Sequence, residues 1–187
     1  RPSELDVVGD GRRVPPLAPV PALARLRWPE LDAWLRAGER TAVMGLGSIE
    51  QHGPHLPFAT DAWIAEWLAA RVAAKLGDAV ALPVVPFGCA SEHAAFPGTL
   101  SLRPATFVAL LEDLLRSVAS HGFARVLVFS AHGGNLAVLR ASSASLEAAA
   151  APCRLVVVAD HAPLDRALSD VGASLGVTAA EQGQHAG

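Results

Sequence analysis

Four side chains of the kinds that bind metals lie close together in the sequence. Glu50, His52, His55 and Asp61 fall within twelve residues, among glycines and prolines and with no Lys or Arg between them. Carboxylates and imidazoles gathered without a cation repel one another or stay idle, and a bound divalent metal removes that problem. Because alternate residues of an extended backbone share a face, Glu50 and His52 can bind from one side, and Asp61 can close the site. The pattern predicts a metal site, with a metal-dependent hydrolase as the leading interpretation.

The surrounding sequence predicts strands that alternate with helices. Short apolar runs predict strands at about 41–46, 79–85, 125–130 and 155–159. Apolar residues at helical spacing predict helices at 29–36, about 64–76 and about 104–121, and an Ala-rich helix that ends near residue 150. Continuous apolar strands between helices are typical of a mostly parallel sheet covered on both faces. We therefore expect an α/β fold built as a three-layer α/β/α sandwich.

Polar residues follow the first three predicted strands. The loop after the first strand carries the four donors, the loop after the second carries Glu92 and His93, and the turn after the third carries His132 followed by Gly133 and Gly134. In open α/β sheets, sites form beyond the carboxyl ends of the strands, so the three loops should meet at one rim. The glycine pair lets the backbone approach a ligand. It would also suit a phosphate-binding turn, but the Lys-Ser/Thr of a P-loop is missing.

Each donor taken alone also has a structural interpretation. Glu50 could cap a helix or pair with an Arg, and an isolated His52 or His132 is more often a packed or surface residue than a ligand. Asp61 stands where an N-cap aspartate would stand, and capping is the commoner role at that position. The combination decides between these interpretations. Two acids and an imidazole within one loop, joined by His132 at another strand end, favour a metal site.

Composition narrows the class of protein. The 187 residues are 51% hydrophobic, which suits the core of one domain. The net charge of −3 and the lack of a basic stripe argue against nucleic acid as a partner. No apolar run approaches the roughly 20 residues of a membrane span, and the N-terminal segment has no apolar h-region of a signal peptide. We therefore expect a cytoplasmic protein without a membrane or nucleic-acid partner.

The chain divides into an arm and a domain. Residues 1–27 are rich in Pro and Arg and have little periodicity, which predicts an extended N-terminal arm. Residues 28–187 predict a single metal hydrolase domain. The cysteines Cys89 and Cys153 lack the spacing of a metal finger and have apolar neighbours, so we expect buried, reduced thiols.

The donor-rich segments resemble the signature motifs of the creatininase (creatinine amidohydrolase) family. The matching segments are 47–61 (GSIEQHGPHLPFATD), 91–101 (SEHAAFPGTLS), 132–135 (HGGN) and 185–187 (HAG). The last one matches the start of the family's His-Ala-Gly-x-x-Glu-Thr-Ser motif. The motifs occur in the family's order, and the match spans roughly residues 41 to 187. The resemblance implies the three-layer α/β/α sandwich of that family.

The resemblance implies a binuclear site that holds two divalent ions, with zinc as the first choice and manganese or iron as alternatives. The implied metal ligands are Glu50, His52, Asp61 and His132. Asp61 would bridge the two ions, whereas His55 has no ligand role in the family.

A further carboxylate belongs to the family's metal site. In most members it is the Glu of the last motif, which would lie five residues after His185 and so beyond Gly187. Creatininase itself uses instead a Glu two residues after the position of His132, where this chain has Gly134. Because the sequence lacks a start Met and stops inside a motif, we expect the C-terminal part of the domain to be truncated.

The resemblance also implies a mechanism. A metal-bound hydroxide would attack an amide-type carbonyl, and His185 would give a proton to the leaving nitrogen or hydrogen-bond to the substrate. Glu92, His93, Gly133 and Gly134 are candidates for the substrate pocket. For Glu92 and His93, a structural role in fixing the turn at 96–99 is an equal alternative.

The implied reaction is hydrolysis of a non-peptide C–N bond in a cyclic amide or a formamide. Family members act on creatinine, on formamidopyrimidine intermediates and on the C-terminal dipeptide of the mycofactocin precursor peptide. A peptidase of that last kind is therefore one alternative, and a non-catalytic member that binds a small molecule is another. A mononuclear lyase or isomerase is a third. The resemblance further implies a homo-oligomer, often a hexamer.

Overall fold

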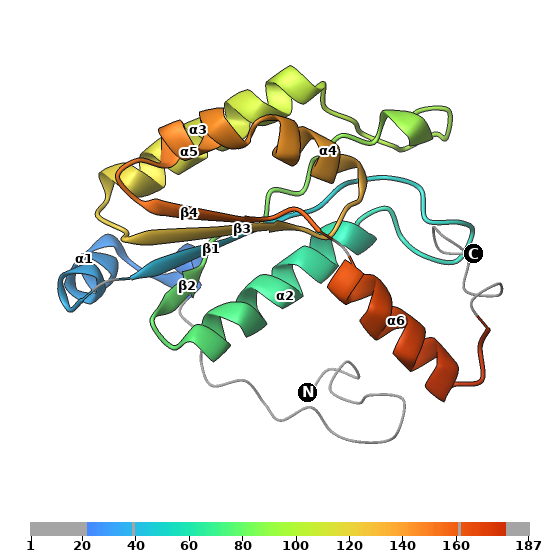
Figure 1. Ribbon diagram of the computed structural model, residues 1–187, viewed down its shortest axis with the longest axis horizontal. Coiled ribbons are helices and arrows are strands. Elements are labelled where there is room, and N and C mark those ends of the chain that lie inside the picture. The colour runs from blue at the N-terminus through green and yellow to red at the C-terminus, as the bar shows by residue number, and fades with distance from the viewer. Residues whose placement is uncertain (1–21, 39, 161, 179–187) are drawn as a thin grey trace.

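Four parallel strands form the centre of the molecule (Figure 1). The computed structural model describes residues 22–38, 40–160 and 162–178. The strands are β1 (Thr41–Leu46), β2 (Ala79–Ala81), β3 (Arg125–Ser130) and β4 (Arg154–Val158). Their order in the sheet is β2-β1-β3-β4, and every pairing is parallel. This confirms the α/β fold expected from the sequence, and puts the carboxyl ends of all four strands at one edge.

One face of the sheet is covered by α3 (Pro104–Ser120) and α5 (Ser143–Ala150), as Figure 1 shows. The buried stripe of α3 contains Phe107, Leu111 and Leu115, which recur every fourth residue and are at most 1% exposed. They pack in one core with apolar side chains of β1 and β3. Removing side chains of this size from water stabilises the fold by about 1.5–3 kcal/mol each, so this face supplies much of the core.

The opposite face is covered by α2 (Thr60–Leu76), as Figure 1 shows, and the backbone of this helix closely approaches Gly45 and Gly47. A Cβ on Gly45 would lie 2.7 Å from Ala65 O, and one on Gly47 would lie 2.5 Å from Ala62 Cα. Only glycine fits where two backbones approach in this way. The contact holds the first turn of α2, which carries Asp61, against the loop that follows β1.

The helix at 60–76 is confirmed, but the apolar stripe that predicts it is not its buried face. Ile64, Trp67 and Leu76 are exposed, and the buried side chains of α2 are small ones such as Ala65 and Ala69. The close approach at Gly45 of β1 and at Gly47, the residue after this strand, explains the difference, since larger side chains would not fit between helix and sheet.

Three further elements differ from the sequence-based expectation. The strand at 79–85 ends at Ala81, and only an isolated bridge to Val85 continues it. The Ala-rich helix is two helices, α4 (Gly134–Ala141) and α5, separated at Ser142. The sequence analysis missed α6 (Ala162–Ser174), whose first backbone N–H at Ala162 donates to Asp160 Oδ1. The last strand and the first helix, α1 (Trp28–Arg36), agree with expectation to within one residue.

The segment before α1 meets the domain directly. Ala22 forms a parallel bridge to Ala81 of β2, and Leu23 and Leu26 pack against the core. The rest of the predicted arm, residues 1–21, lies outside the described residues. Cys89 and Cys153 are buried, free thiols, as expected, and burial raises the pKa of both. Within the described residues, no helix is both long and apolar enough to cross a bilayer.

The glycine contact between β1 and α2 can be tested with Gly47→Ala. The new methyl group would overlap the backbone of Ala62, so α2 must move and we expect a loss of about 1–3 kcal/mol of unfolding free energy in urea denaturation. Gly133→Ala is the matched control, because a Cβ there meets nothing within 4 Å. Equal stability of the two variants would contradict the close packing of α2.

Candidate metal centre

One buried carboxamide joins the loops that follow β1, β2 and β3. Asn135 Oδ1 accepts a hydrogen bond from the backbone N–H of Cys89 at 2.9 Å. Its Nδ2 donates to Gly47 O at 3.1 Å and to Ser130 Oγ at 3.1 Å. The three loops therefore meet at one rim, as topology predicts, and a fully buried side chain sets their separation.

Glu50 is buried beneath this rim with its two carboxylate oxygens in different surroundings. Oε2 accepts a hydrogen bond from Ser48 Oγ at 3.3 Å, and Oε1 lies 3.0 Å from His132 Nδ1. The backbone N–H of Glu50 donates to Phe58 O, which closes the loop behind it. Glu50 is 0% exposed, so contacts with these neighbours must compensate its carboxylate for the water that burial removes.

His52 and His132 are held in the same way by backbone carbonyls. His52 Nδ1 lies 3.2 Å from Glu50 O, and His132 Nε2 lies 2.9 Å from Cys89 O. A carbonyl oxygen can only accept, so the proton of each neutral ring belongs on that nitrogen. The other nitrogen then carries a lone pair, which is the arrangement of histidines that bind metals.

Both of those remaining nitrogens face Asp61. His52 Nε2 lies 3.0 Å from Asp61 Oδ1, and His132 Nδ1 lies 3.2 Å from Asp61 Oδ2. Within the described part of the chain, Asp61 Oδ2 is the one buried side-chain oxygen or nitrogen without a hydrogen bond. Lone pairs that face one another at this distance need a cation between them, whether protons or metal ions.

A proton on His132 takes one of these places when no metal is bound. Burial alone would lower the pKa of His132, but the carboxylates of Asp61 and Glu50 outweigh burial and raise it to about 10. Glu50, Asp61 and His132 each offer a ligand atom, all within 4.8 Å of one another. The donor set therefore fits a divalent ion. The two oxygens of Asp61 face different histidines, so this carboxylate would suit a position between two ions.

Asp61 does not cap α2, so the capping interpretation is wrong. The N-cap of α2 is Ala59, with no side-chain cap bond, and Asp61 lies in the first turn with its side chain buried. A carboxylate at that end of a helix is favoured by about 0.3–1 kcal/mol through the helix dipole. The first turn of α2 is therefore a favourable position for the side chain of Asp61.

Of the other predicted site residues, Glu92 and Gly134 lie beside the cluster. His55 is exposed, unlike the buried residues of the cluster. Glu92 is half exposed, and its Oε1 lies 4.0 Å from His132 Nε2. A Cβ on Gly134 would overlap Cys89 O, whereas one on Gly133 would meet open space. His185, the predicted proton donor, lies outside the described residues.

Sequence reasoning missed the polar residues that position the ligands. Ser48, Asn135 and Ser130 are buried, and Ser130 Oγ both donates to His132 O and accepts from His132 N–H. Their signal in the sequence is weak: each is a small polar residue at the end of an apolar strand or beside glycines. Such residues point to a site only once their partners are known.

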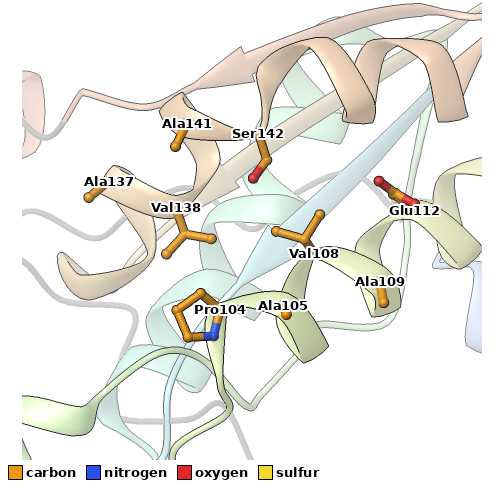
Figure 2. A pocket seen from close by; sticks show the side chains of 9 residues that line it. All are labelled: Pro104, Ala105, Val108, Ala109, Glu112, Ala137, Val138, Ala141 and Ser142. Carbon is orange, nitrogen blue, oxygen red and sulfur yellow. The ribbon is translucent and has the colours of Figure 1, made fainter.

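A groove of about 620 Å³ lies elsewhere, between α3 and α4 (Figure 2). Small apolar side chains such as Ala105, Val108 and Ala141 line it, and Glu112 is its one ionisable residue. Glu112 pairs with Arg116, and none of the predicted metal ligands lines the groove. It therefore lacks the groups for hydrolysis, and the cluster around Asp61 is the candidate site.

Comparisons with known proteins point to one protein family. A sequence model of the creatininase family, described as creatinine amidohydrolase, matches residues 24–187. The mycofactocin precursor peptide peptidase of Mycolicibacterium smegmatis is 40% identical over 130 residues, which cover 64% of this chain and 52% of that protein. The creatinine amidohydrolase of Pseudomonas putida is 31% identical over 118 residues, which cover 60% of this chain and 45% of that protein.

The fold is similar to that of a solved creatininase variant described as a Zn-Zn type. The two chains share 26% identity with a TM-score of 0.67, over 75% of this chain and 58% of the other. The chain spans about half the length of the curated relatives it matches.

The raised pKa of His132 predicts how the stability of metal-free protein depends on pH. The folded state holds a proton with a pKa of about 10 against 6.5 for an ordinary histidine, so this stabilisation is complete below pH 6.5 and is lost as pH rises through 10. We expect the unfolding free energy to fall by up to about 1.4 kcal/mol per pH unit in that window. Urea denaturation of chelator-treated protein would measure it. His132→Gln should remove the slope, and an unchanged slope would contradict the assignment.

Proposed function

The chain belongs to the creatininase family, and from this premise we propose that it is a metal-dependent hydrolase that cleaves a C–N bond of an amide. One observation carries the proposal: two histidines, each held by a backbone carbonyl, direct their other nitrogens at the separate oxygens of Asp61. Buried acceptors in that arrangement are a binding site for cations.

The proposed ligands are Glu50, His52, Asp61 and His132, with Asp61 shared between two ions. Imidazole and carboxylate ligands suit zinc first, and manganese or iron as alternatives. A divalent pair in this position would supply a water of lowered pKa and would polarise the amide carbonyl.

The residues of this chain would orient the ligands, contact the substrate and supply a proton. Ser48 and the carbonyls of Glu50 and Cys89 keep the ligands oriented, so that little reorganisation accompanies the reaction. Glu92 and His93, on the short turn η3 (Ser91–His93), are proposed to face the substrate. His185 remains the proposed proton donor to the leaving nitrogen.

Two substrate classes compete. The family resemblance favours a small cyclic amide or a formamide, whereas the identity to the peptidase, 40% against 31% for creatinine amidohydrolase, favours a peptide. Gly134 argues against creatinine itself. Any side chain there would overlap Cys89 O and crowd Glu92, so the metal-binding Glu that creatininase places at this position does not fit. Between the two classes, we favour release of a short C-terminal fragment from a peptide.

Metal content and activity of the full chain test the proposal together. We expect about two ions per chain by elemental analysis, and Asp61→Asn should lose metal and lower kcat/KM by at least about 100-fold, because it removes the shared charge. His55→Gln is the matched control: it is a histidine of the same loop, exposed and outside the cluster, and should keep both ions.

The substrate panel then separates the alternatives. Peptides with free C-termini, formamides and cyclic amides should be assayed with the metal-loaded protein. Turnover of a formamide or cyclic amide alone would overturn the preference for peptides. If the folded protein takes up no metal, the hydrolase proposal is overturned and the alternative of a non-catalytic binding protein is favoured. We also expect a homo-oligomer, with a hexamer as the family's precedent, which sedimentation would test.

A further inference from the structure

The carboxamide of Gln51 links the loop of the metal ligands to the loop after β2. Gln51 stands between Glu50 and His52 in the sequence, and its Nε2 lies 3.0 Å from His93 Nδ1 on η3. Its backbone N–H donates to Thr99 Oγ1 at 3.4 Å, at the far end of the same loop. One residue of the metal-ligand loop therefore contacts both ends of the segment that carries Glu92 and His93.

The orientation of this carboxamide follows from a backbone donor. The N–H of Gly53 lies 2.9 Å from Gln51 Oε1, and a backbone N–H can only donate. The atom facing Gly53 must therefore be the oxygen, which assigns the NH₂ group to the side of His93. Because that group can only donate, His93 Nδ1 must accept. The imidazole is then neutral and carries its proton on Nε2.

This fixed tautomer stands beside the metal centre. Glu92, the neighbour of His93, brings Oε1 to 4.0 Å from His132 Nε2, and Gln51 is flanked on both sides by proposed ligands. His93 is only partly buried, at the same rim. With Nδ1 engaged by Gln51, that nitrogen is kept from binding an ion itself, and the ring presents a hydrogen-bond donor at Nε2.

We propose that Gln51 is a positioning residue that fixes His93 as the Nε2–H tautomer, and that His93 thereby donates a hydrogen bond to a carbonyl or carboxylate oxygen of the substrate. The substrate part rests on the proposed amide hydrolase function, whereas the tautomer does not. A neutral donor of fixed orientation suits an amide or a peptide C-terminus, because both kinds of group present oxygen acceptors. A neutral His93 ring also adds no charge beside the proposed metal ions.

Nitrogen NMR of ¹⁵N-histidine-labelled protein tests the tautomer. The chain has seven histidines, and the signals of His93 are those absent from His93→Gln. In the wild-type chain, metal-loaded or metal-free, Nδ1 of His93 should resonate as a non-protonated nitrogen and Nε2 as a protonated one. In Gln51→Glu the carboxylate can only accept, so the proton should move to Nδ1 or the ring should become doubly protonated. A wild-type ring protonated at Nδ1 would overturn the assignment.

Kinetics of the same variants test the role in substrate binding. His93→Leu should lower kcat/KM by about 10- to 100-fold, the range for a lost hydrogen bond to a polar or charged group, and His93→Gln, which keeps an N–H near the position of Nε2, should restore part of it. Gln51→Glu and Gln51→Leu should lose activity to a similar degree while both keep two ions. Unchanged kcat/KM in His93→Leu would overturn the substrate contact.

The experiments distinguish failure of the proposed function from failure of the proposed role of Gln51. A chain that hydrolyses no amide but shows the expected His93 signals, and their change in Gln51→Glu, contradicts the proposed function and supports the positioning by Gln51. An active chain whose His93 signals are the same in Gln51→Glu as in wild type contradicts the positioning alone. Loss of metal in Gln51→Leu would show that Gln51 supports the metal ligands instead, and would also overturn the proposed positioning of His93.

Discussion

The buried carboxylate of Asp61 is the constraint on which the site depends. Its two oxygens face nitrogens of His52 and His132 whose rings are already committed, by backbone carbonyls, to present lone pairs. Acceptors that face each other away from water are costly unless a cation lies among them. The scaffold therefore holds its ligands in an arrangement that a bound cation stabilises, and metal binding and local folding are coupled.

The rest of the scaffold keeps that arrangement from relaxing. Two glycines bring α2 against β1, so that the helix delivers Asp61 to the loop. Asn135 binds the three strand-end loops to one another at distances near 3 Å. A repulsive cluster on independent loops would simply spread apart. Here Asn135 and its partners Gly47 and Ser130 lie within three residues of Glu50 or His132, so movement of one loop would break hydrogen bonds to the others.

Much of this architecture could be predicted from the sequence, because apolar strands and glycine stops are local signals. The strands at 41–46 and 125–130 begin and end where expected, and the acid–imidazole pattern pointed to the segment that carries Glu50 and Asp61, two members of the buried cluster. The buried face of α2 could not be read in this way, because helix periodicity does not record how closely the helix approaches the sheet. Neither could the role of Asn135, whose partner Cys89 lies 46 residues away and leaves no local trace.

The position of Gly134 limits which loop can bring a further side chain to the cluster. The space that a side chain would need is filled by the carbonyl of Cys89, which orients His132, and by the carboxylate of Glu92. A carboxylate ligand at this position would displace the contact that fixes the imidazole, so the two arrangements exclude each other. The backbone of this chain therefore leaves that side of the cluster to the loop after β2. Glu92 of η3 reaches towards the cluster on that side, with its Oε1 4.0 Å from His132 Nε2.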